Sequence, residues 1–333
     1  MFYYMKKPSF YLFCTLPFLL CCIACVSIHA QQDASLAFQS AGDGVFTFNT
    51  GAYKGVLHGS KKPQGLRSLV DGQSGMEISK LPGLLCFYRL LSVNQRWERD
   101  FRERDTAANL LADGALQVTW SPEEDYPIEL IATYKWKAKN ILDLGITFTP
   151  TRMMRDVEVF LSSYFNKKLK GYVYADKTFM LPGKPAFLPA DVKGPADFLY
   201  GTYLAFPRDP RAAQIIYDGR WEKGLHPVHF SVTRFYKYPL FVKKDPASGT
   251  SALLMARPED CFSLEMSYNR EPADNIANHS SVYFSLFGED LRAGETRHTT
   301  IRLVLGNKIE EQEALRFYHE YLDDVNESSA NRP

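Results

Sequence analysis

Two long runs of alternating apolar and polar residues restrict this chain to a β fold more than any other feature. Apolar side chains recur at every second position through 128–136 and again through 142–148. This period places the apolar side chains on one face of an extended strand and the polar ones on the other. The turn residues Lys139 and Asn140 separate the runs, so we expect an antiparallel hairpin.

The same signal recurs along most of the chain. A shorter alternating run, 116–120, follows the turn dipeptide Asp113-Gly114, and 157–161 has apolar residues at its odd positions. The opposite face of that last strand would carry Glu158, Phe160, Ser162 and Tyr164. Further strands are predicted at 200–206, 213–217, 228–235, 251–256, 261–267, 282–287 and 297–305. The fold class is therefore all-β, a large antiparallel β-sandwich.

Two segments depart from the strand pattern. Residues 167–197 hold four prolines and three glycines without any period, which predicts a long excursion over the surface. Residues 309–324 place apolar side chains at helical spacing, with Glu310, Glu311 and Glu313 in the first turn, where they complement the helix dipole. We expect one C-terminal helix that has a structural role.

The N-terminus has the pattern of a signal peptide. Lys6 and Lys7 precede an apolar run, 10–26, and Ala30 ends a plausible cleavage site. We therefore expect residues 1–30 to be removed and 31–333 to form a single domain that is secreted or periplasmic, with no transmembrane segment after cleavage. A lipid anchor is the less favoured alternative, since no cysteine of this segment follows a good small-residue lipobox.

Composition excludes several classes of protein. The 39 basic and 38 acidic residues give a formal net charge of +1, with no basic excess for nucleic acid. Four of the six cysteines fall within residues 1–30. Cys86 and Cys261 remain, either as one disulfide or, as we prefer, as two buried thiols. No Cys-x-x-Cys spacing remains outside residues 1–30 and no phosphate-binding glycine loop is present, so no metal or cofactor is expected.

Three segments resemble the galactose mutarotase family. Residues 290–305, with Leu-Arg-Ala-Gly-Glu before a Thr-rich strand, are similar to its closing turn and strand. Ser162-Ser-Tyr-Phe-Asn166 resembles its central His-Ser-Tyr-Phe-Asn strand end, and Cys261–Met266 is a looser echo of its Leu-Glu segment. The resemblance implies a mutarotase-like β-supersandwich, with Glu265 at the position of the catalytic base.

The chain departs from the family at the acid. Ser162 stands where the family has the histidine that protonates the sugar ring oxygen, and a serine hydroxyl cannot donate a proton near neutral pH. A replacement acid would have to come from His58, His226 or His229. Of these, we favour His226 or His229.

A second group of residues suits carbohydrate binding. Trp221 would stack on the C–H groups of a sugar, while Arg220 beside it binds hydroxyls or a carboxylate and Asp218 contributes from the preceding turn. Tyr164 faces outward on its strand and would reach a cleft, so it is a further candidate catalytic residue; the alternative is a core or rim aromatic without a function. The alternative is a Trp that covers the core, with its Arg in a surface ion pair.

Two other clusters have weaker functional interpretations. Arg96 and Arg99 lie in a run of mixed charge, which predicts either a rim that binds acidic sugars or a solvated, self-paired surface. His226 and His229 are three residues apart on an extended segment, so they point to opposite faces, and no third metal ligand is evident.

These observations lead to two functional hypotheses. The first is a secreted carbohydrate-active protein that binds an oligo- or polysaccharide on the concave face of its larger sheet. It would act by proton transfer in the manner of an epimerase or lyase, with Glu265 as base. The second is a non-catalytic carbohydrate-binding or accessory protein of the same fold, which the missing histidine favours.

Overall fold

The computed structural model describes residues 36–93, 95–176, 183–190, 203–224, 227–232, 234–267 and 280–330. Residues 32–333 belong to one compact unit, and the expected signal peptide lies outside the described residues. No helix of the described chain is both long and apolar enough to cross a membrane.

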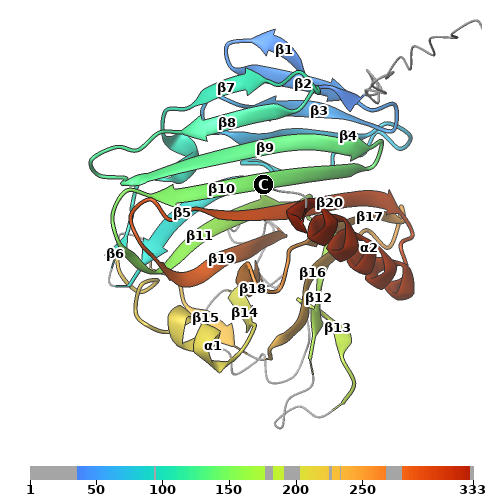
Figure 1. Ribbon diagram of the computed structural model, residues 1–333. Helices are drawn as coiled ribbons and strands as arrows, with labels where there is room; N and C mark the ends of the chain where they lie inside the picture. The colour runs from blue at the N-terminus through green and yellow to red at the C-terminus, as the bar shows by residue number, and fades with distance from the viewer. Residues whose placement is uncertain are drawn as a thin grey trace, which may run out of the picture. The chain divides into compact units, whose positions relative to one another are not determined.

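The described strands form three sheets, which are antiparallel apart from one parallel pair, β14 and β15 (Figure 1). The nine-stranded sheet contains, in spatial order, β13 (Ala186–Pro189), β12 (Lys170–Ala175), β16 (Tyr236–Lys244), β17 (Thr250–Met255), β20 (Arg297–Asn307), β10 (Ile141–Pro150), β9 (Ile128–Ala138), β8 (Leu116–Trp120) and β7 (Ala107–Leu110). The seven-stranded sheet contains β15 (Phe230–Val232), β14 (Tyr203–Pro207), β18 (Cys261–Ser267), β19 (Ser281–Leu291), β11 (Met154–Tyr164), β5 (Cys86–Ser92) and β6 (Gln95–Arg96). The four-stranded sheet contains β1 (Gln39–Gly42), β2 (Val45–Asn49), β3 (Tyr53–His58) and β4 (Gly65–Asp71).

The predicted hairpin is confirmed as β9 and β10. Leu142 pairs with Trp136 and Leu144 with Tyr134, and every second residue of both strands is buried. The intervening side chains are mostly half-buried.

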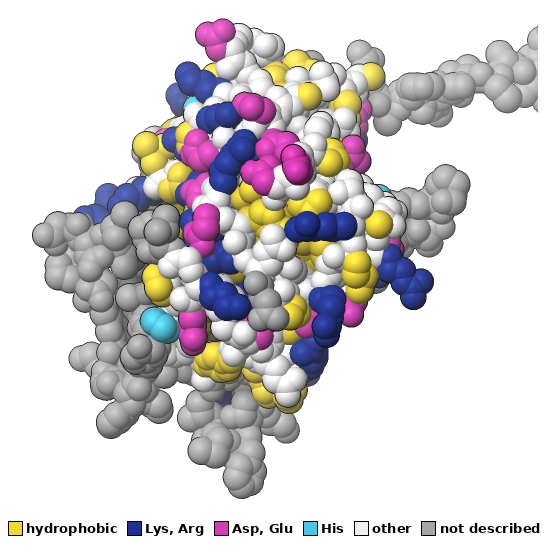
Figure 2. Space-filling model, turned by 90° about the vertical axis from the view of Figure 1, so that its left-hand side faces the viewer, with side chains coloured by type: hydrophobic (Ala, Val, Ile, Leu, Met, Phe, Trp, Pro, Cys, Tyr) yellow, Lys and Arg dark blue, Asp and Glu magenta, His cyan; other side chains and the backbone are white. Residues whose placement is uncertain are grey.

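Acidic and basic side chains are interspersed on the side of the molecule that Figure 2 shows. The fold class, an all-β sandwich with a C-terminal helix, is therefore confirmed.

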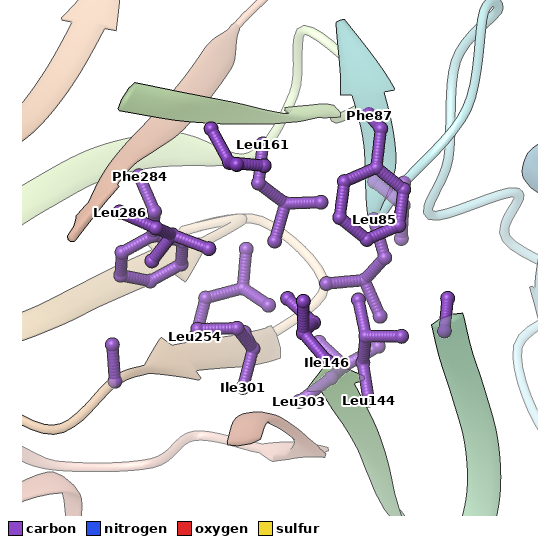
Figure 3. Packing of buried hydrophobic residues seen from close by; sticks show 14 of the residues in the cluster. Leu85, Phe87, Leu144, Ile146, Leu161, Leu254, Phe284, Leu286, Ile301 and Leu303 are labelled. Carbon is purple, nitrogen blue, oxygen red and sulfur yellow. The ribbon is translucent and has the colours of Figure 1, made fainter. Parts of the chain in front are cut away.

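The main core lies between the seven-stranded and nine-stranded sheets (Figure 3). Leu161 and Phe284 come from the seven-stranded sheet and face Ile146 and Leu303 of the nine-stranded sheet. All four side chains are at most 2% exposed. Burial of apolar area on this scale, at about 25 cal/mol per Å², is the main source of the fold's stability.

The four-stranded sheet adds to this core. Leu66 and Leu84 exchange two backbone hydrogen bonds, of 3.0 and 2.8 Å, which connect β4 to the segment just before β5. The rings of Phe48 and Trp136 lie 5.0 Å apart between centroids, so β2 packs against the central strands of the nine-stranded sheet.

The predicted C-terminal helix is α2 (Glu311–Ala330), with Glu311 and Glu313 in its first turn. Figure 1 shows it across the strands β20 and β17. Tyr318 and Tyr321 are fully buried there and pack against Val304 and Met255. Thus α2 covers the outer face of the nine-stranded sheet, the face that points away from the main core.

One predicted strand is wrong. Residues 213–217 fall in and just after a helix, α1 (Pro210–Ile216). The Asp209 side chain caps this helix by accepting a hydrogen bond from the Ala212 amide at 2.9 Å, and Pro210 occupies its first turn. A short 3-10 helix, Phe101–Glu103, is the other helical segment described.

The expected excursion at 167–197 is also wrong where it is described. Residues 170–175 form β12, which pairs with β16 and β13 at one end of the nine-stranded sheet. Its buried Gly171, Val173 and Ala175 alternate with larger half-buried residues. The rest of this segment, 177–182 and 191–197, lies outside the described residues.

Cys86 and Cys261 are free, buried thiols, as preferred from the sequence. They lie in β5 and β18, which are separated by two other strands of the same sheet. Burial raises the pKa of the Cys86 thiol to about 11, so it is not a ready nucleophile.

We predict that Leu161→Ala lowers the free energy of unfolding by about 2–5 kcal/mol, because the cavity it leaves lies between two sheets that cannot collapse freely. Urea denaturation would measure this loss. Thr133→Ala, on the half-buried outer face of β9, serves as the control and should change stability by no more than about 0.5 kcal/mol. Equal effects of the two substitutions would contradict the position of the core.

Candidate functional site

The outer face of the seven-stranded sheet, which points away from the main core, carries an unusual set of polar groups. Glu158 comes from β11, Glu265 from β18 and Ser285 from β19, and each side chain is about 1% exposed. Carboxyl groups at this depth are rare unless they are paired or functional. We call Glu158, Glu265, Ser285 and Arg220 the carboxyl cluster.

The Ser285 hydroxyl connects the two carboxyl groups. Its oxygen lies 2.8 Å from Glu158 Oε1 and 3.1 Å from Glu265 Oε1. Since a hydroxyl has one hydrogen, it donates to one carboxylate and accepts from the other carboxyl group in its protonated form. The arrangement therefore holds one proton more than two ionised glutamates would.

The two carboxyl groups differ in their charged partners. Burial raises the pKa of Glu265 well above its ordinary value, and the charge of Glu158 raises it further. Burial also raises the pKa of Glu158, but Arg220 opposes this, with Nη1 3.3 Å from Glu158 Oε2. The extra proton thus resides on Glu265, while Glu158 stays ionised beside the guanidinium.

The second oxygen of the Glu265 carboxyl group is less well satisfied than the first. Its Oε2 atom is buried and makes no hydrogen bond of good geometry, although the nearby Ser263 hydroxyl lowers the pKa of this carboxyl group. A buried polar atom without a partner costs roughly 1–3 kcal/mol, so proteins retain such atoms mainly where water or a ligand completes them.

Three tyrosines lie beside this cluster. The ring centroid of Tyr283 is 6.0 Å from that of Tyr164 and 5.8 Å from that of Tyr203. Tyr283 is also the strand neighbour of Glu265. Burial raises the pKa of Tyr203 to about 12 and raises those of Tyr164 and Tyr283. All three therefore keep their phenolic protons, and hydrogen bonds link the Tyr283 hydroxyl to those of Tyr164 and Tyr203.

The backbone of this sheet is strained. Four of the six non-glycine residues with positive φ in the described chain lie within it or directly beside it, at Leu85 (52°), Asp156 (43°), Ser280 (25°) and Phe287 (77°). Each costs roughly 1–3 kcal/mol, and such residues concentrate at functional sites.

Arg220 and Asp218, which the sequence placed in one carbohydrate-binding group, lie together at the carboxyl cluster. Arg220 is fully buried, and its Nε and Nη2 atoms bind the Asp218 carboxylate at 2.8–3.1 Å. Its Nη1 atom also donates to the Asp156 carbonyl at 2.8 Å. Arg220 thus joins the turn at 217–224 to β11, and its donors are largely engaged within the protein.

Trp221 lies against the sheet in the same turn. Its ring centroid is 4.6 Å from that of Phe160 and 5.2 Å from that of Phe230, and the side chain is 3% exposed. Arg96 donates to the Trp221 carbonyl at 3.2 Å and stacks over its ring at 5.6 Å. The contacts of Trp221 are those of a ring that covers an apolar surface.

The other predicted site residues are placed as follows. Tyr164 lies on the same outer face and is 7% exposed. Arg99 lies away from the carboxyl cluster and pairs with Glu123 at 3.3 Å. His229 is half-buried in the segment before β15, and His226 lies outside the described residues. The roles assigned to these residues stay predictions.

The position of the site within the fold differs from expectation in one respect. Glu265 and Tyr164 belong to the seven-stranded sheet, which is the smaller of the two large sheets. Ser162, at the position of the family histidine, donates to the Cys86 carbonyl at 2.9 Å and is fully buried. Its hydroxyl is therefore occupied by the backbone of the neighbouring strand.

Sequence reasoning did not assign a role to Glu158, Ser285, Tyr203 or Tyr283. Alternation within the strands places each of them on the outer face, but only their pairing across β11, β19, β18 and β14 brings them together. Within the described chain, no three His, Cys, Asp or Glu side chains gather in a way that could hold a metal ion.

No protein-family model and no curated protein matches the chain. Among solved structures it is similar to a putative aldose 1-epimerase from Escherichia coli K12, with a TM-score of 0.48 and 8% identity over 79% of this chain and 99% of that one. An aldose epimerase homologue from C. elegans has a TM-score of 0.46 and 10% identity over 82% and 98%. An alpha-N-acetylgalactosaminidase from Bifidobacterium bifidum has a TM-score of 0.47 and 10% identity over 87% of this chain and 39% of that one. Aldose epimerase structures, the group that the sequence motifs resemble, are thus among its structural neighbours.

We predict that Glu265→Gln becomes progressively more stable than the native protein as pH rises. A carboxyl group whose folded pKa exceeds its ordinary value of 4.5 stabilises the fold below that value and loses this contribution as pH rises toward the folded pKa. Glutamine mimics the protonated form and does not titrate. Urea unfolding between about pH 4.5 and about pH 8 would measure the difference between the two proteins.

Glu129→Gln, on the half-buried outer face of β9, is the control for this experiment. Its stability difference from the native protein should stay nearly constant over the same pH range. A constant difference for Glu265→Gln as well would mean that Glu265 is ionised in the folded protein.

Proposed function

We propose that this protein is a secreted carbohydrate-active protein that binds a sugar on the outer face of the seven-stranded sheet and that Glu265 transfers a proton there. The buried carboxyl pair of Glu265 and Glu158, bridged by the Ser285 hydroxyl, is the observation that carries the proposal. Secretion is supported by the signal-peptide pattern of residues 1–30.

The geometry favours a proton donor. Because the proton of the carboxyl cluster resides on Glu265, this group offers a hydrogen to a sugar oxygen at neutral pH, whereas an ionised carboxylate would accept one. The carboxylate left after donation lies beside Glu158, and their mutual repulsion favours its reprotonation. The proton on Glu265 is therefore easily returned.

The tyrosines provide the binding surface in this proposal. Tyr164, Tyr203 and Tyr283 combine apolar rings with protonated hydroxyls, which suits the mixed C–H and O–H surface of a sugar. Tyr203 is only partly buried, so the face is more accessible there than at Glu265. His229 is retained as the candidate for the second proton-transfer group.

The second candidate is a non-catalytic carbohydrate-binding protein of the same fold. Two observations favour it: the Ser162 hydroxyl is bound to the backbone, and Arg220 and Trp221 are used to attach the 217–224 turn. In this case the carboxyl cluster would serve recognition and stability, without turnover.

A glycan array, followed by assays for epimerised, reducing-end and unsaturated products, would distinguish the two candidates. We predict that Glu265→Gln lowers turnover by about 10²–10⁴-fold, because the amide cannot release a proton, while sugar binding changes little. The Glu129→Gln control should keep full turnover. Sugar binding without turnover by the native protein would establish the second candidate, and normal turnover by Glu265→Gln would refute the first.

A further inference from the structure

A groove lies outside the carboxyl cluster, where two turns meet. One is the turn between β5 and β6, and the other joins β10 to β11. The Val93 amide donates to the Arg155 carbonyl at 3.0 Å, which holds the turns together. The groove between them has a volume of about 380 Å³, within the usual range of about 300–1,000 Å³ for small-molecule sites.

The lining of the groove carries positive charge without an acidic residue. Its side chains come from Ser92, Val93, Gln95, Trp97, Arg152, Met153, Met154 and Arg155. Arg152 donates to Gln95 Oε1 at 3.2 Å, an interaction that leaves its charge uncompensated. Neither Arg152 nor Arg155 has a carboxylate partner among the described residues, although most other described arginines do.

The groove also has an apolar part. Trp97 is held in place because its Nε1 atom donates to the Asp125 carbonyl at 2.6 Å and its ring packs 6.1 Å from that of Tyr126. Met153 is 52% exposed at the groove. The side that carries β6 in Figure 1 faces the viewer in Figure 2, where apolar side chains are exposed among charged ones.

We propose that this groove binds a carboxylate-bearing sugar residue of a glycan, with Arg152 and Arg155 as its ligands for the carboxylate. Guanidinium groups bind carboxylates through paired N–H donors, and the exposed Met153 side chain offers apolar contact to the sugar ring, over a floor formed by the largely buried Trp97. The identity of the ligand as a sugar rests on the proposed function, whereas its negative charge follows from the groove alone.

This assignment changes which arginines recognise acidic sugars. Arg96 and Arg99 are engaged elsewhere, with the 217–224 turn and with Glu123 respectively. Arg152 lies just before β11 and Arg155 is its second residue, on the same strand that carries Glu158. A glycan chain bound in the groove would therefore lie near one end of the sheet whose outer face holds the carboxyl cluster.

Isothermal titration calorimetry of the full chain with tetragalacturonate and with maltotetraose, a neutral glycan of equal length, tests this proposal. We predict that the native protein binds tetragalacturonate more tightly and that Arg152→Gln/Arg155→Gln weakens this binding at least about 10-fold. Raising salt from about 0.01 M to about 0.15 M should weaken it as well, since both arginines are exposed. Arg316→Gln, on the exposed side of α2, is the control and should bind as the native protein does.

Three results would overturn the proposal: no binding of tetragalacturonate by the native protein, equal affinity for both glycans, or unchanged affinity of the double variant. Competition by inorganic sulfate, at matched ionic strength, as strong as that by galacturonate would also overturn it, because the groove would then bind any anion. The proposed function has a separate outcome, since Glu265→Gln should retain tetragalacturonate binding in the groove while it loses turnover.

Discussion

The ion pair between Arg220 and Glu158 is the interaction on which the outer face of the seven-stranded sheet depends. Both groups are almost completely buried, and Arg220 also binds Asp218 and the Asp156 carbonyl. Removal of one partner from such a pair leaves an uncompensated buried charge, at a cost of about 3–5 kcal/mol. The same guanidinium holds the 217–224 turn over the sheet and keeps Glu158 ionised. The Arg220 side chain therefore has two effects: it holds the turn that covers the sheet, and it makes the two carboxyl groups of the cluster unequal.

The strand pattern of the sequence was most informative where one face of a strand is exposed. In β9 and β10 the burial alternates, so the apolar period identifies both strands. In β11 nearly every residue is buried, because Arg220 and Trp221 of the 217–224 turn cover its outer face. Alternation predicts which side chains share a face there, but not that this face is covered. The helix α1 was missed although Asp209-Pro210 is a helix-start signal, because its few apolar residues also fit a short strand.

The candidate site was predictable in part for a similar reason. A short motif that resembles a known family points to Glu265 as a site residue, and residue type alone points to Arg220 and Asp218. The link between them is Glu158, which lies more than 50 residues before Asp218 in the chain and is brought close only by strand pairing. Trp221 and Arg96 have the residue types of a sugar site, but their contacts are internal. The type of a residue indicates what its side chain can bind. Which group it actually contacts depends on how the strands of the whole sheet pair.

The carboxyl cluster also bears on Ser162, which the sequence resemblance aligns with the family's histidine. In the family that the motifs resemble, histidine protonates the ring oxygen and glutamate removes the proton of the anomeric hydroxyl group. Here Ser162 cannot act as acid, while burial, and to a smaller extent the charge of Glu158, raises the pKa of Glu265 and favours its protonated form. Under the proposed function, Glu265 would protonate the ring oxygen as the C–O bond breaks, and a separate base would take the anomeric hydroxyl proton as the carbonyl forms. Ring closure returns both protons, so Arg220 can keep Glu158 ionised throughout. The second carboxylate would then be a positioning group that converts the family's base into an acid.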